Sequence, residues 1–186
     1  MLSIKYFPII TFIVSFLLLC TFTDIYGQQK EEKVRISPKA SITQTVGFTD
    51  ITISYSRPGV KGRKIWGGLV PYDKVWRAGA NEATKITFST DVKVEGKKLS
   101  AGSYSFFAIP GKSDWTLIFN KTADQWGAFE YNEAEDAFRF TVKPEKGNFT
   151  EWLRYEITRT SDNTATISLL WENLKVPFKV EVKLNK

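Results

Sequence analysis

The segment Phe178-Lys179-Val180-Glu181-Val182-Lys183-Leu184 alternates apolar and polar side chains along its whole length. The same period of two occurs in Phe138-Arg139-Phe140-Thr141-Val142 and in Lys85-Ile86-Thr87-Phe88-Ser89. Because successive side chains of a β-strand point to opposite faces of its sheet, this pattern is typical of strands that bury one face. Turn-forming stretches such as Glu95-Gly96-Lys97-Lys98 and Ala101-Gly102 separate the alternating segments. Short alternating strands between regular turns predict an antiparallel all-β fold.

The pattern continues through most of the chain past residue 40. It predicts a single antiparallel β-sandwich of jelly-roll-like architecture with about ten strands. We expect the last span, 164–183, to be two strands that are broken at Asn173-Leu174-Lys175. Helix is expected to be minor, with one turn near 132–136 and another within 147–152. The expected strands are 41–46, 51–56, 74–77, 84–90, 91–95, 103–109, 115–120, 136–143, 151–159 and 164–183.

The N-terminal residues have the pattern of a secretory signal peptide. Lys5 supplies a positive charge, an apolar run ends at Cys20, and Gly27 is a small residue before the expected cleavage site. Cleavage there would leave no stable membrane span and would export the protein to the periplasm or the extracellular space. The expected organisation is a signal peptide at 1–27, a polar segment at 28–36 and a single β domain at 37–186.

Two alternatives to cleavage stay open. Residues 6–23 carry no charge and just reach the length of a membrane span, so an uncleaved segment would anchor the protein in the inner membrane. Lipidation of Cys20 is disfavoured, because Leu19 stands where lipoprotein processing favours a small side chain. After cleavage no cysteine remains, so the core must supply the stability without disulfides.

Composition excludes several kinds of chemistry. The 186 residues include no histidine and one cysteine, and the formal net charge is +6. Histidine-dependent triads, zinc sites built from His or Cys, c-type haem and iron–sulfur clusters are therefore excluded. We expect no cofactor and no metal. Nucleic acid is not an expected partner, because the basic residues are dispersed along alternating strands and the chain is predicted to be exported.

The stretch from Ser56 to Ala83 interrupts the regular alternation, and long irregular segments in compact β domains are often functional. Arginine binds carboxylate, phosphate or sulfate through a planar fork of donors, and tryptophan offers a flat face for a sugar ring or a cation. The stretch predicts a non-catalytic binding module for a glycan or another anionic component of the cell envelope. The candidate ligand-binding residues are Arg57, Arg63, Trp66, Trp76, Arg77, Asn81 and Glu82.

Two other functions fit the same residues. In the first, Glu82 is the acid–base residue of a sugar hydrolase or isomerase, with Asp73, Asp50 or Glu130 as a second carboxylate. A neighbouring arginine would lower the pKa of Glu82, which opposes a role as general acid. In the second, the protein has a structural role and no ligand. Arg57 and Arg77 would then pair with Asp73 or Glu82, and Trp66 and Trp76 would belong to the core.

Several motifs together resemble a bacterial family known as domain of unknown function 2911. The resemblance covers about residues 37–183 and implies a β-rich fold and an exported protein of Gram-negative bacteria. It implies no activity, ligand or catalytic residue. The motifs are Tyr55-Ser56-Arg57-Pro58, Lys61-Gly62-Arg63, Val70-Pro71-Tyr72, Val75-Trp76-Arg77, Gly79-Ala80-Asn81-Glu82-Ala83-Thr84, Leu99-Ser100-Ala101-Gly102-Ser103-Tyr104-Ser105, Ile109-Pro110 and Trp115-Thr116-Leu117-Ile118-Phe119-Asn120.

Overall fold

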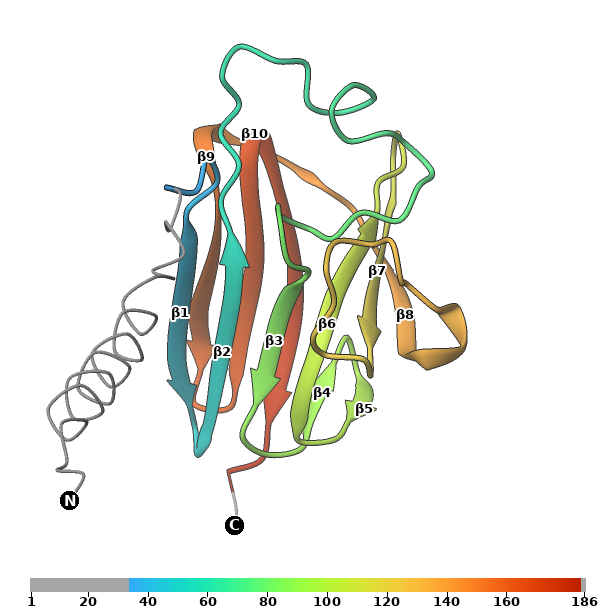
Figure 1. Cartoon of the computed structure of the whole chain (residues 1–186). Coiled ribbons are helices and arrows are strands. Elements are labelled where there is room, and N and C mark those ends of the chain that lie inside the picture. The colour runs from blue at the N-terminus through green and yellow to red at the C-terminus, as the bar shows by residue number, and fades with distance from the viewer. Residues whose placement is uncertain (1–33, 185–186) are drawn as a thin grey trace, which may run out of the picture. The chain divides into compact units, whose positions relative to one another are not determined.

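The alternating segments form strands that bury one face. In β3 (Thr84–Phe88) every second residue is buried, and the intervening Lys85 and Thr87 are half-buried on the other face. The computed structural model describes residues 34–184, which form two antiparallel β-sheets packed as a sandwich (Figure 1). The predicted all-β sandwich is confirmed. The expected signal peptide at 1–27, with Cys20, lies outside the described residues.

Six strands form the larger sheet, in the order β1-β2-β3-β6-β7-β8. The chain changes sheet only between β3 and β4, between β5 and β6 and between β8 and β9. Neighbours in sequence are therefore mostly neighbours in the sheet, an order of meanders that differs from the expected jelly-roll-like order. Besides β3, the strands of this sheet are β1 (Lys39–Val46), β2 (Thr49–Ser56), β6 (Gly102–Ile109), β7 (Trp115–Asn120) and β8 (Asp136–Val142).

The smaller sheet has the order β5-β4-β10-β9. Its strands are β4 (Val92–Val94), β5 (Lys97–Leu99), β9 (Glu145–Ser161) and β10 (Thr164–Val182). A straight strand as long as β10 would separate its ends by about 60 Å. The Val182 backbone N–H nevertheless donates to the Asn163 carbonyl at 2.8 Å, so β10 doubles back. The reversal lies near Glu172, which has a φ of 55° and a register shift on each side. The path of the chain therefore agrees with the expected pair of strands broken at Asn173-Leu174-Lys175.

Three local expectations are wrong. Residues 74–77 form no strand, because Trp76 makes only an isolated bridge with Ala108. The turn signal at 95–98 hides β5, which pairs with β4 across that turn. The expected helical turn within 147–152 is part of β9, which pairs with β10 there. The turn near 132–136 is confirmed as a 3-10 helix at Glu133–Glu135.

Among residues 34–184, no helix has the length and apolar character needed to cross a membrane.

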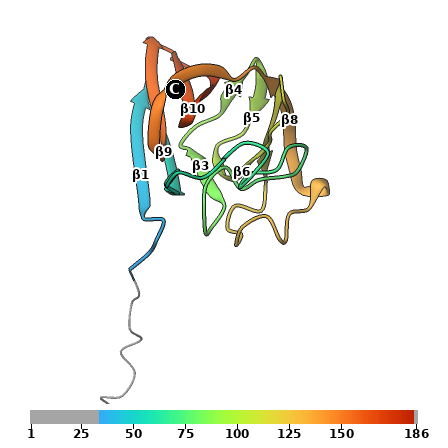
Figure 2. The ribbon, with the colours of Figure 1, turned by 90° about the horizontal axis from the view of Figure 1, so that it is seen from above.

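The irregular segment 57–83 lies across one end of the sandwich (Figures 1 and 2). It continues from β2 and is bonded to β9 of the other sheet. The Val60 N–H donates to the Glu151 carbonyl at 2.8 Å, and the Leu153 N–H donates to the Pro58 carbonyl at 3.0 Å. The segment therefore joins the two sheets before it returns to β3 at Thr84.

Candidate functional site

Glu82 lies at the end of the irregular segment, just before β3, and is the centre of a cluster of charges. The Arg35 guanidinium donates to both oxygens of its carboxylate, at 2.7 and 2.8 Å. The Lys39 ammonium lies 3.1 Å from the same carboxylate, and the Ser56 hydroxyl donates to it at 3.4 Å. The hydrogen bonds from Arg35 hold the pKa of Glu82 well below its usual range.

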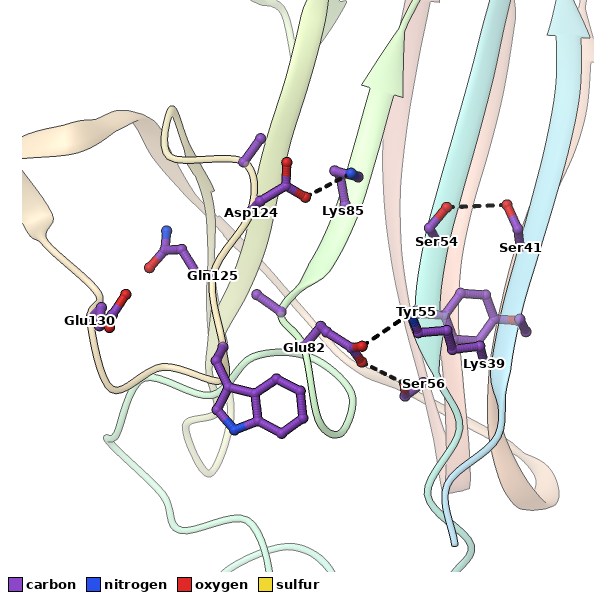
Figure 3. A pocket seen from close by; sticks show the side chains of 14 residues that line it. Lys39, Ser41, Ser54, Tyr55, Ser56, Glu82, Lys85, Asp124, Gln125 and Glu130 are labelled. Carbon is purple, nitrogen blue, oxygen red and sulfur yellow. Dashed lines mark hydrogen bonds and ion pairs between the residues drawn. The ribbon is translucent and has the colours of Figure 1, made fainter. Parts of the chain in front are cut away.

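This cluster forms part of a cavity of about 630 Å³ on the outer face of the larger sheet (Figure 3). The floor is polar, because the outward residues of β1, β2 and β3 face it. Ser41 and Ser54 are cross-strand partners with their hydroxyls 3.2 Å apart, and Lys85 is the next residue in the same row. The residues that line the cavity are Lys39, Ala40, Ser41, Ser54, Tyr55, Ser56, Glu82, Ala83, Lys85, Ala123, Asp124, Gln125, Trp126 and Glu130.

The other wall is the loop 121–131 between β7 and the 3-10 helix. Trp126 on this loop is 56% exposed and forms an isolated bridge with Glu82. The Ala83 N–H donates to the Gln125 carbonyl at 3.0 Å, and the Lys85 ammonium bonds Asp124 at 2.8 Å. The loop is therefore joined to the start of β3, and Trp126 lines the same cavity as Lys39 and Ser56.

A buried amide network fixes the conformation of this loop. Nε2 of buried Gln125 donates to the Ser105 hydroxyl, to Oδ1 of Asn120 and to the Thr122 carbonyl, at 3.1, 3.1 and 2.7 Å. Ser105 and Asn120 are fully buried strand residues of the larger sheet. A loop anchored by several buried hydrogen bonds needs little ordering when a ligand binds. The exposed indole of Trp126 is thus presented by a preorganised support.

The charges that line the cavity nearly balance. Lys39 and Lys85 are each paired with a carboxylate, and Glu130 adds one more acid. With Arg35 beside Glu82, three cations and three carboxylates lie at the site. Such a surface offers many donors and acceptors but no excess charge for an ionic ligand. Within residues 34–184, no cluster of three metal-ligating side chains is present.

The sequence-predicted arginines lie elsewhere. Nε of Arg57 donates to the Leu153 carbonyl at 3.0 Å, Arg63 donates to the carbonyls of Gly59 and Val60, and Arg77 donates to the Asn81 carbonyl at 2.7 Å. Among the described residues, neither Arg57 nor Arg77 forms an ion pair with Asp73 or Glu82, so the pairing expected for a structural role is wrong. Arg57 and Arg77 donate to backbone carbonyls instead, and the Glu82 carboxylate accepts from Arg35.

The predicted tryptophans belong to a cluster of four. Trp66, Trp76, Trp115 and Trp171 have ring centroids 4.8 to 6.4 Å apart. One face of Trp76 is covered, because its ring stacks on Trp171 at 5.8 Å with an interplanar angle of 17°. Trp66 and Trp76 therefore pack against the core, as the structural alternative expected.

Of the seven predicted ligand-binding residues, only Glu82 lines the large cavity. Arg63, Trp76 and Arg77 line a second, smaller cavity at the end of the sandwich, whereas Arg57, Trp66 and Asn81 line neither. The side-chain amide of Asn81 donates to the Ser37 carbonyl at 3.2 Å. Among the second carboxylates considered for catalysis, Glu130 lines the large cavity, but Asp50 and Asp73 do not.

Arg35, Lys39 and Trp126 are the site residues that the sequence reasoning missed. Arg35 belongs to the polar segment that precedes the expected domain, and Lys39 precedes the first expected strand, 41–46. Trp126 carried a usable signal, because it stands between Gln125 and Gly127 in a stretch without alternation. A tryptophan in such a stretch is often exposed, since a turn gives it no sheet to pack against.

Comparison with known proteins gives the family of the chain. A sequence model of the family described as "Protein of unknown function (DUF2911)" matches residues 37–180. The match covers most of the chain, so the chain belongs to this family, as its motifs indicated. No curated protein and no solved structure gives a significant match. The family description states no activity.

Proposed function

We propose that this member of the DUF2911 family is an exported, non-catalytic binding module for a glycan. The glycan binds in the large cavity, between Trp126 and the outer face of β1, β2 and β3. The observation that supports the proposal most strongly is an exposed indole, held by an anchored loop, in the same cavity as hydroxyl, ammonium and carboxylate groups.

The chemistry of a sugar matches both sides of this cavity. A pyranose has C–H groups on its faces and hydroxyls around its edge. The flat apolar face of an indole stacks on the C–H groups. The sugar hydroxyls can form hydrogen bonds with Ser41, Ser54 and Lys85. The cavity volume of about 630 Å³ lies within the usual range for small-molecule sites. The balanced charges favour a neutral glycan at this site over an anionic one.

Binding has more support than catalysis. A hydrolase that uses Glu82 as general acid needs that carboxyl protonated near neutral pH, which requires a raised pKa. The bidentate bond from Arg35 lowers the pKa of Glu82 instead. Glu82 therefore stays ionised and acts as an acceptor for a ligand hydroxyl and for the side chains that hold it in place.

Trp126→Ala is expected to weaken glycan binding by roughly tenfold, because losing roughly 60 Å² of apolar contact at about 25 cal/mol per Å² costs about 1.5 kcal/mol. The secreted protein is screened on an array of neutral and acidic glycans, and the strongest neutral hit is measured by isothermal titration calorimetry. The melting temperature should change little, since the indole is 56% exposed.

Phe149→Ala is the matched control, because Phe149 is 60% exposed and lines none of the cavities described. It should bind the glycan as the unchanged protein does. The proposal fails if no glycan binds, or if Trp126→Ala binds with unchanged affinity. Release of shorter saccharides during the titration, lost in Glu82→Gln, would favour the hydrolase instead.

Export is the second part of the proposal and is tested by mass. The charge, apolar run and small residue of segment 1–27 support cleavage after Gly27. The intact mass of the protein recovered from the periplasm or medium should correspond to a chain that begins at Gln28. A mass that retains residues 1–27, or that carries a lipid on Cys20, would contradict cleavage at this site.

A further inference from the structure

A second cavity lies at the end of the sandwich, beneath the irregular segment 57–83. Its volume is about 250 Å³, which is enough for a molecule of about the size of a monosaccharide. The residues that line it are Ile36, Ser37, Pro58, Gly59, Lys61, Arg63, Leu69, Val70, Trp76, Arg77, Gly79, Ala80 and Trp171.

Cations line this cavity without a matching carboxylate. Lys61, Arg63 and Arg77 are among the lining residues, and no Asp or Glu is. None of the three forms an ion pair with a residue of the described range 34–184. The carboxylate of Glu151 is near, but it accepts from the backbone N–H of Lys61 at 2.9 Å. This excess of positive charge distinguishes the end cavity from the balanced cavity beside Trp126.

The two arginines keep donors for a ligand. A guanidinium has five N–H donors. Arg63 directs Nε and one terminal nitrogen to the carbonyls of Val60 and Gly59, and Arg77 directs one terminal nitrogen to Asn81. The Arg77 guanidinium also lies over the Phe129 ring, 5.7 Å from its centroid. These contacts fix both side chains and leave N–H groups without an acceptor among the described residues. Burial lowers the pKa of Arg77, because the cation has lost part of its water. An anion would compensate for that loss.

The two tryptophans of this cavity form its apolar wall. Trp171 lines the cavity but is only 1% exposed, and its Nε1 is enclosed by protein atoms. Trp76, which stacks on Trp171, donates its Nε1–H to the Gly79 carbonyl at 3.1 Å. Neither indole N–H is therefore open to a molecule in the cavity.

We propose that the end cavity binds a compact organic acid whose single oxyanion group, a carboxylate or a phosphate, is held by Arg63 and Arg77. Trp76, Val70 and Pro58 contact the apolar part of the molecule. Both oxyanions suit the planar fork of an arginine, so sugar acids and sugar phosphates share the required chemistry. The site is separate from the glycan cavity and does not depend on it.

The probes are glucuronate, glucose 6-phosphate, neutral glucose and inorganic phosphate, each titrated into the full-length secreted protein. Calorimetry gives the affinity, and the fluorescence of the tryptophan cluster reports occupancy. We expect one of the two sugar anions to bind, more weakly as salt rises, and glucose not to bind. The sugar anion that binds shows whether the site takes a carboxylate or a phosphate. Failure of both sugar anions, or inorganic phosphate binding as tightly as either, would overturn the proposal.

Variants separate this site from the glycan cavity. Arg77→Gln and Arg63→Gln should each weaken binding by roughly tenfold or more, since each removes charged hydrogen bonds. Arg159→Gln is the matched control, because Arg159 lies outside this cavity. Trp126→Ala should bind the anion as the unchanged protein does. If Arg63→Gln and Arg77→Gln also bind it with unchanged affinity, the proposed site is refuted.

Discussion

Phe119→Ala is expected to lower the free energy of unfolding by about 3–5 kcal/mol, the usual cost of removing a fully buried phenylalanine. Phe119 of β7 is 0% exposed and lies at the centre of the aromatic core between the sheets. The substitution removes the apolar contacts and leaves a cavity that rigid neighbouring strands cannot fill. Six aromatic rings have centroids 5.2 to 6.1 Å from that of Phe119, namely Phe88, Tyr104, Phe106, Phe138, Phe140 and Phe178.

The measurement is urea unfolding followed by far-ultraviolet circular dichroism. A domain of this size has a total stability of about 5–15 kcal/mol, so the midpoint should fall markedly while the slope stays constant. Phe119→Leu should lose less, because it retains part of the apolar volume. Phe149→Ala, at an exposed position of β9, should change stability by no more than about 0.5 kcal/mol. Equal losses in the two alanine variants would refute the central role of Phe119.

Local patterns explain why the fold could be predicted. Each side-chain alternation, as in Phe138-Arg139-Phe140-Thr141-Val142, directly gives the two faces of a strand. The predictions failed where pairing overrides local preference. The residues of β5 read as a turn, yet Lys97 and Leu99 pair with Val94 and Val92. Gly147 lowers the strand signal of its segment, but β10 pairs with β9 on both sides of it.

The site was harder to predict, because its contacts join residues far apart in sequence. Glu82 was identified as a candidate from its setting among small residues, but its partner Arg35 is 47 positions away. Nothing in the local sequence of Arg35 indicates that contact. The same holds for Trp126, whose bridge to Glu82 depends on the buried bonds of Gln125. Of the three candidate arginines, Arg63 and Arg77 line one cavity at the end of the sandwich, and Arg57 does not.

One buried side chain connects the core to both cavities. The hydroxyl of Tyr155 on β9 donates to the Ala78 carbonyl at 2.8 Å, and the Thr84 hydroxyl donates to the same carbonyl at 3.0 Å. Ala78 has a φ of 48°, a left-handed conformation that is unfavourable for alanine. These two bonds help to hold that conformation. Ala78 follows Arg77 of the end cavity and precedes Glu82 of the large one by four residues, so the bonds position the chain between the two sites.

Tyr155→Phe is expected to make the protein less sensitive to alkaline pH. Burial raises the pKa of Tyr155 well above its ordinary value of 10.0, because the phenolate would lose its water. In the unfolded chain the phenol ionises at its ordinary pKa. The stabilising contribution of the neutral phenol is therefore fully present below about pH 10 and is lost as the pH rises towards the folded pKa. The loss is about 1.4 kcal/mol per pH unit.

Urea unfolding at pH 9, 10 and 11 measures this dependence. At pH 9, Tyr155→Phe should be about 1 kcal/mol less stable, because one hydrogen bond is lost and Ala78 keeps its bond from Thr84. Above pH 10 the unchanged protein should lose stability faster than the variant, by about 1.4 kcal/mol for each pH unit. Thr84→Val removes the other hydrogen bond to Ala78 but no titrating group. Its free energy of unfolding, plotted against pH, should therefore lie below that of the unchanged protein and parallel to it. The contrary result is a pH dependence of Tyr155→Phe that equals that of the unchanged protein. In that case the Tyr155 phenol ionises as readily in the folded protein as in the unfolded chain, and its burial does not set the alkaline stability.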